Sequence, residues 1–388
     1  MLEPAATLVS APQSRRLPHA DNLRAALVAW IIGGHALLGY SAIGGWEYDE
    51  INEVTFGERV EFVLTAILGP SALLVIGAFF FIAGLFAPRA LDRRGPGRFV
   101  LDRTLRLALP YLAFALLLWP LIIWLTYRAV GRADSYWWVF THRDPLLDAG
   151  PLWFVAVLFI FSVAYAGWRV LRPAVGSAGG AGRTLRGGHL VALAVGLTLA
   201  TFVVRLWLPA RSNHVGDLHL WQWPQCAALF GFGIAWASSG LPEKVPDRVR
   251  RGCGATILTM FGLLPLLAFA LGISELEASV EPFLGGWRWQ ALLTAAIEST
   301  LVVVGSVWLL GMAQRRMTQR GRLATAATRA AYAAFVLQGP VLLTIAVAAR
   351  PVTVPVEVKA FLVAALGIGF SFWLGWLLVS RTRLGRIF

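Results

Sequence analysis

Charged residues are scarce in this sequence. Only 14% of its 388 residues are Asp, Glu, Lys or Arg, whereas 57% are hydrophobic and the mean hydropathy is +0.67. This is more apolar surface than the core of a soluble protein can bury. The composition therefore excludes an ordinary soluble domain and indicates a polytopic membrane protein.

Cysteine is also scarce, and the long runs lack the alternation of apolar and polar residues that is typical of strands. The chain has two cysteines, Cys226 and Cys253, each in or near a long apolar run. Two separated cysteines exclude a disulfide framework and predict no metal site, so we interpret them as packing residues. The apolar runs are too long and too uniform for the strands of an outer-membrane barrel.

Long hydrophobic runs recur along the whole chain. About 18 or more apolar residues are enough to cross a hydrocarbon core of about 30 Å. The sequence predicts an all-α, polytopic membrane helical bundle of about ten transmembrane helices. The predicted spans are 23–43, 63–88, 107–127, 152–170, 189–208, 221–238, 255–274, 289–311, 329–349 and 356–379. The sixth contains Gly231 and Gly233, and the ninth is rich in alanine.

The net charge of +13 reflects how basic residues are distributed. They concentrate in alternate loops, which by the positive-inside rule places both termini in the cytoplasm and segments 44–61 and 128–151 outside. No separate basic domain is evident, so no nucleic-acid partner is predicted. The predicted organisation is a cytoplasmic tail over 1–22, one transmembrane domain over 23–380, and a basic cytoplasmic tail over 381–388.

One histidine lies deep in a predicted span. His35 follows Arg24 by eleven positions, so both side chains share one face of the first helix, about 16 Å apart along its axis. An imidazole in hydrocarbon costs on the order of 1–3 kcal/mol unless it has a partner. His35 is therefore either functional or held by an interhelical hydrogen bond. Arg24 by itself is better explained as a membrane anchor whose side chain reaches the interface.

A basic loop follows the second span. The segment 79–114 runs from "FFFIAGLF" into a loop with several arginines, then into "DRTLRLALP". Arg103 and Arg106 are three positions apart, so on a helix they would project from one face and could bind phosphate oxygens. The alternative is that this loop is only the most basic of several inner loops.

The ordered set of motifs resembles a known family. Arg24 and His35, "FFFIAGLF", "DRTLRLALP" and "GPLWFVAVLF" (150–159) together resemble the integral-membrane acyltransferases that include bacterial glucan succinyltransferases and O-antigen and peptidoglycan O-acetyltransferases. The resemblance covers residues 20 to 380. "AAYAAFVLQGPVLL" (330–343) is similar to the family's penultimate helix, although Gln338 stands where many members have histidine.

The resemblance implies an enzyme of the bacterial cytoplasmic membrane that transfers an acyl group, such as acetyl or succinyl, from acyl-coenzyme A to a hydroxyl. Arg24, Arg103 and Arg106 would hold the donor's phosphates, and His35 would be the general base on the acceptor. A covalent acyl-histidine is the less favoured route. Because no soluble transfer domain is recognised in the sequence, direct acylation is expected.

The acceptor is less defined. A glycan, a lipid or a secreted metabolite would suit an outer site, where Glu58, Glu61, Trp153 and Gln338 are weaker candidates for substrate contact. Glu58 and Glu61 are better explained as solvated loop charges, and Trp153 as an interfacial residue. The alternatives are a proton-coupled transporter, favoured by an intramembrane histidine, and a non-catalytic membrane subunit. Besides donor, acceptor and bilayer, self-association is compatible with such a bundle.

Overall fold

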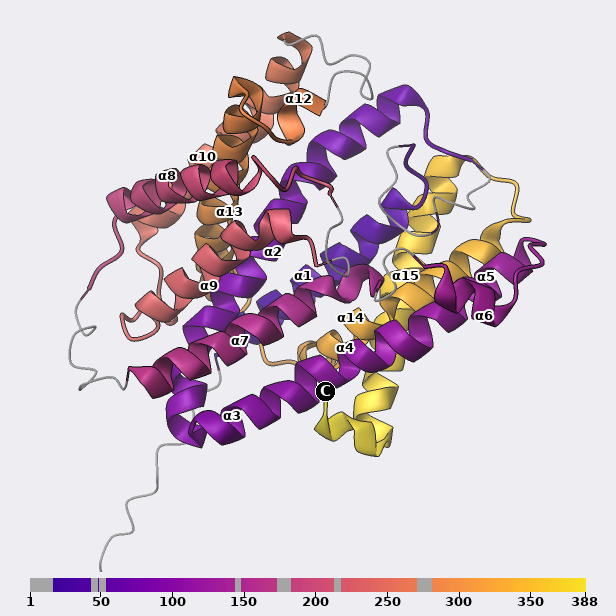
Figure 1. The fold of residues 1–388 in the computed structure, drawn as a ribbon, viewed down its shortest axis with the longest axis horizontal. Helices are drawn as coiled ribbons and strands as arrows, with labels where there is room; N and C mark the ends of the chain where they lie inside the picture. Colours follow the sequence, from indigo (N-terminus) through magenta and orange to yellow (C-terminus); the bar gives the residue numbers. More distant parts are fainter. Residues whose placement is uncertain are drawn as a thin grey trace, which may run out of the picture.

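The described part of the chain is helical (Figure 1). The computed structural model describes residues 17–42, 48, 54–143, 148–172, 183–212, 218–270 and 281–388, and these contain helices and no strand. The α-helices are α1 Pro18–Leu38, α2 Glu58–Arg94, α3 Pro96–Arg103, α4 Leu109–Ala113, α5 Trp119–Ala129, α6 Tyr136–Thr141, α7 Trp153–Leu171, α8 Gly187–Val204, α9 Trp223–Trp236, α10 Asp247–Ala270, α12 Glu281–Leu284, α13 Trp289–Arg316, α14 Arg322–Ala349 and α15 Val356–Arg381.

Seven helical segments of the described residues are long and apolar enough to cross a membrane. The all-α prediction is therefore confirmed. Three predicted spans, 23–43, 221–238 and 255–274, correspond to α1, α9 and α10, which are not among the seven. The number of ten spans and the cytoplasmic position of both termini remain predictions. The described residues leave out much of the predicted outer segment 44–61 and residues 144–147 of the predicted outer segment 128–151.

The segment Pro96–Ala129 is one continuous helix that is not regular throughout. It contains two π-helical turns, Thr104–Ala108 and Phe114–Leu118. Pro110 lacks the amide that would bond the carbonyl of Arg106, because proline has no N–H. The hydroxyl of Tyr332 in α14 donates to that carbonyl instead, at 2.7 Å. The irregular turn therefore fixes this helix against α14.

The side chains pack into two large cores. One joins α1, the Pro96–Ala129 helix, α14 and α15; the other joins α2, α7, α8, α9, α10 and α13. Phe154 of α7 lies at the seam and packs against both cores. Its ring centroid is 4.8 Å from that of Phe335 in α14 and 5.5 Å from that of Phe79 in α2. The seam between the cores brings α1, α2, α7 and α14 together.

Two glycines let α2 and α9 approach closely. A Cβ on Gly84 would overlap the carbonyl oxygen of Phe230 and lie 3.1 Å from the Cα of Gly233. A Cβ on Gly233 would overlap the carbonyl oxygen of Phe81. Small residues at facing positions are the usual means by which membrane helices pack closely. The glycine of the "FFFIAGLF" motif thus has a structural role in this fold.

Candidate functional site

His35 lies near the end of α1 and is bonded to α14. Its Nδ1 is 3.1 Å from Oε1 of Gln338, whose side chain is fully buried. A carboxamide oxygen only accepts hydrogen bonds, so with the Gln338 oxygen facing the ring a neutral imidazole donates from Nδ1. Nε2 then carries the lone pair that can accept a proton. Gln338 of α14 thus orients the imidazole of His35 in α1.

An apolar cavity adjoins His35. Its volume is about 120 Å³, and its walls come from α1, α2, α14 and the start of α7. Trp30, Trp153, Phe154 and Phe335 supply aromatic walls, and His35 is the one ionisable side chain among the described residues that line it. A base in such a site would act on a hydroxyl with little competition from bulk water.

A second pocket lies at the other end of α1 and is strongly basic. Its volume is about 660 Å³, and Arg24, Arg93, Arg106 and Arg329 line it together with Asp21. These arginines come from α1, α2, the π-turn of the third helix and α14. Four guanidinium groups and one acidic side chain line this pocket, and Asp102, which pairs with Arg106, adds a second carboxylate nearby. The excess of positive charge suits a multiply charged anion.

The three predicted donor-binding arginines differ in their surroundings. Arg24 pairs with Asp21 at 3.0 Å and its guanidinium lies 5.2 Å from the ring centroid of Phe86, in the "FFFIAGLF" motif. Arg106 pairs with Asp102 at 3.1 Å and is about half exposed. Both therefore carry carboxylate partners at the pocket edge, and an anion would compete with or join these pairs.

Arg103 does not line the basic pocket. Its guanidinium lies 5.1 Å from the ring centroid of Phe99, and its Nε is buried without a hydrogen-bond partner among the described residues. The charges of Arg24 and Arg106 still act on it. Arg103 is the last residue of α3 and Arg106 belongs to the π-turn that follows. Of the two, only Arg106 lines the pocket.

The weaker candidates are also placed. Trp153 is buried and lines the cavity of His35. Its contact with substrate remains a prediction. Glu61 accepts hydrogen bonds from the hydroxyl of Ser41 and, at 3.2 Å, from the amide of Ala42, so it holds the chain that follows α1. Glu58 is exposed in the first turn of α2. Neither carboxylate lines the cavity of His35.

Two further residues of the site escaped the sequence analysis. Arg329 of α14 lines the basic pocket together with Arg24 of α1. The ring centroid of His219 is 4.5 Å from that of Trp153. Its φ of 46° is unusual for a residue other than glycine, which is a feature often found at functional sites.

The chain was compared with known proteins. A family model described as an acyltransferase domain matches residues 18–380, nearly the whole sequence. The chain belongs to this acyltransferase family. The acyltransferase matched no curated protein and no solved structure significantly. Its apolar helices and its family together identify a multi-pass membrane enzyme that transfers acyl groups other than aminoacyl groups.

No group of three or more metal-ligating side chains that could hold an ion is present in the parts of the acyltransferase that the structure describes.

Proposed function

We propose that this enzyme moves a short acyl group from cytoplasmic acyl-coenzyme A to a hydroxyl of a glycan, a lipid or a secreted metabolite in the bacterial cytoplasmic membrane. One observation supports this most. A single helix, α1, carries Arg24 at the basic pocket and His35 at the apolar cavity, and eleven residues separate them by about 16 Å. Donor binding and chemistry are thereby assigned to opposite ends of one rigid element.

The basic pocket suits the phosphates of coenzyme A. Guanidinium groups bind phosphate oxygens through paired hydrogen bonds, and Arg24, Arg93, Arg106 and Arg329 approach from four helical segments. Arg103 adds positive charge near Arg24 and Arg106. The pantetheine arm would then extend along α1 and bring the thioester to His35.

His35 would act as the general base. Its Nε2 takes the proton from the acceptor hydroxyl while the oxygen attacks the thioester carbonyl. The tetrahedral intermediate collapses, the carbon–sulfur bond breaks, and the thiolate of coenzyme A recovers the proton from the imidazolium. The products are an ester and the free thiol, and the imidazole returns to its neutral form. Gln338 positions the ring through Nδ1 and has no proton to exchange.

The cavity favours small acyl groups and an acceptor that can lie against aromatic rings. About 120 Å³ accommodates an acetyl or succinyl group better than a long fatty acyl chain. Trp153 and Trp30 offer faces on which a sugar ring can stack. A panel of radiolabelled acyl-coenzyme A donors, offered to membranes that contain the protein, would identify the acyl group and the labelled acceptor.

Two variants of His35 test the base. We expect His35→Ala to lower the transfer rate by about 10²–10⁴-fold, the usual contribution of a positioned base. His35→Gln can keep the contact with Gln338 but cannot accept a proton usefully near neutral pH. It should therefore melt close to wild type and remain inactive. Transfer rate and melting temperature in one detergent make the comparison; an active His35→Gln enzyme contradicts the proposal.

The donor pocket has a matched control on one helix. Arg329 lines the pocket, whereas Arg322, seven positions earlier in α14, is exposed and does not. Loss of a charge-assisted hydrogen bond of about 1.5–3 kcal/mol predicts roughly tenfold or greater weakening of acetyl-coenzyme A binding in Arg329→Ala and Arg106→Ala. Arg322→Ala should bind as wild type in calorimetry. Equal affinities in all three variants would leave these arginines as membrane anchors.

A further inference from the structure

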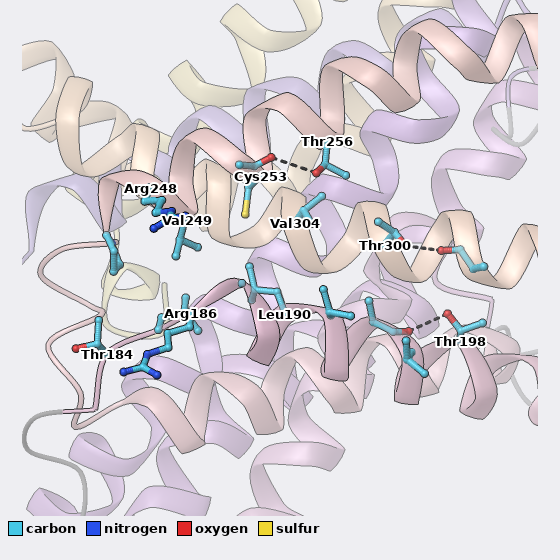
Figure 2. A pocket seen from close by; sticks show the side chains of 18 of the residues that line it. Thr184, Arg186, Leu190, Thr198, Arg248, Val249, Cys253, Thr256, Thr300 and Val304 are labelled. Carbon is cyan, nitrogen blue, oxygen red and sulfur yellow. Dashed lines mark hydrogen bonds between the residues drawn. The ribbon is translucent and has the colours of Figure 1, made fainter.

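A long groove opens away from the site of His35. Helices α8 and α10 both pack on α13, and the space between them has a volume of about 1010 Å³ (Figure 2). None of the residues that line this groove lines the cavity of His35 or the basic pocket. The groove is thus a separate feature of the described residues, and acyl transfer as proposed makes no use of it.

The interior of the groove is apolar. Its walls include Val191, Val195 and Leu199 of α8, all more than half exposed, and Val304 of α13. The interior hydroxyls are satisfied within their own helices. They belong to Thr198, Thr256 and Thr300, which donate to the carbonyls four residues earlier at 2.8, 3.1 and 2.8 Å. The groove therefore offers hydrocarbon contact and few hydrogen bonds.

One end of the groove is basic. Figure 2 shows Arg186 and Arg248 at the end opposite Thr198 and Thr300. Both arginines are exposed, and neither forms an ion pair with a carboxylate among the described residues. Asp247, the neighbour of Arg248, is bound by Arg315 at 2.8 Å and by Arg250 at 3.3 Å. The hydrogen bond from Arg315 lowers the pKa of Asp247, and its charge is already compensated.

The length of the groove matches one leaflet. From Arg186 to Leu199 the chain advances thirteen residues, which is about 20 Å along the helix axis. Half of a hydrocarbon core of about 30 Å is about 15 Å. A lipid with its headgroup at the arginines could therefore lay its acyl chains along the groove. Glu243, which lies shortly before α10, pairs with Arg89 of α2 at 3.5 Å. The basic end of the groove is therefore on the same side of the bundle as the basic end of α2.

We propose that the groove between α8 and α10 binds an anionic phospholipid, with its phosphate at Arg186 and Arg248 and its acyl chains against α8 and α13. Exposed arginines can bind an acidic headgroup, and the apolar walls beside them can contact the lipid tails attached to it. A free phosphate would use the arginines alone, and a second copy of the chain would use the apolar walls alone. The groove combines both features.

The test compares lipids that differ in one part. Purified full-length protein is titrated in detergent with dioleoyl phosphatidylglycerol, with dioleoyl phosphatidylcholine and with glycerol 3-phosphate, and the melting temperature is followed. We expect stabilisation by phosphatidylglycerol at the lowest mole fraction and none by glycerol 3-phosphate. Each arginine contributes on the order of fivefold in affinity at an anionic surface, so Arg186→Gln with Arg248→Gln should raise the half-saturating mole fraction about 25-fold.

Two further variants separate the walls from the charge. Val195→Trp places a large ring in the groove and should reduce stabilisation by phosphatidylglycerol while the arginines stay intact. Arg322→Gln, on an exposed position of α14, is the control and should titrate as wild type. Native mass spectrometry of the same samples counts retained lipids. Equal responses to both phospholipids in wild type and in the double arginine variant would overturn the proposal, as would a groove-dependent dimer without bound lipid.

Discussion

Close packing of α2 against α9 predicts a large difference between two glycines two positions apart. In Gly233→Ala the new Cβ would overlap the carbonyl oxygen of Phe81 and lie 2.7 Å from the amide nitrogen of Leu85. These are backbone atoms, so no rotamer change relieves the contact and one helix has to move. Gly231 faces open space, with nothing within 4 Å of its added Cβ. Gly231→Ala is therefore a matched control in the same helix.

The magnitude follows from overpacking. Insertion of a methyl group into a close contact typically costs about 1–3 kcal/mol, and rigid backbone neighbours place Gly233→Ala at about 2 kcal/mol or above. Alanine is intrinsically the better helix former by up to about 1 kcal/mol, so Gly231→Ala should be neutral or stabilising. At roughly 2–4 °C per kcal/mol, the melting temperature of Gly233→Ala should fall by about 4–8 °C.

The assay is thermal unfolding of both variants and wild type in one detergent at one scan rate, since membrane proteins often unfold irreversibly. Gly84→Ala, on the opposite side of the contact, should behave like Gly233→Ala. The double variant should lose less than the sum, because one displacement of the helices relieves both overlaps. Wild-type melting of Gly233→Ala, or an equal loss in Gly231→Ala, would refute the packing argument.

Three other measurements bear on the site and the fold. Gln338→Leu should lower turnover while donor affinity in calorimetry stays the same, because the imidazole loses its orienting partner; unchanged turnover would make Gln338 a packing residue. Glu298→Ala should destabilise the protein by about 3–5 kcal/mol, because it removes the carboxylate that is bonded at 2.5 Å to the buried Arg205. An unchanged melting temperature would contradict this. Asp134→Cys should react with an impermeant thiol reagent in intact cells and Arg320→Cys should not; the reverse pattern would overturn the predicted topology.

The sequence was sufficient for the helical fold because long apolar runs have few alternatives in a membrane. It also placed His35 and Arg24 on one face, since that depends only on helical period within α1. Arg329, which lines the basic pocket with Arg24, and Gln338, which is bonded to His35, lie more than 290 residues further along the chain and reach them through the packing of α14. Period and composition carry no information on which helices become neighbours, so the bond from His35 to Gln338 needed the structure.

Local irregularity was likewise beyond the sequence. Arg103 and Arg106 were expected to point the same way from a regular helix, and the π-turn that begins at Thr104 separates them. The distinction between Gly231 and Gly233 has the same origin. Both looked like weak points of one span, and only the position of α2 makes one of them a contact and the other an open site.

Because of the π-turns, how many residues the Pro96–Ala129 helix contains matters as much as which residues they are. A π-turn closes with i→i+5 bonds and so holds one residue more than an α-turn. Deletion of a single residue between Thr104 and Ala108 would leave the helix intact but rotate everything after it by about 100°. Trp119, whose ring abuts Gly150 and Gly339, would then leave its place beside α14, while the arginine end stayed unchanged. A one-residue deletion here would thus uncouple the two ends of the span without breaking it.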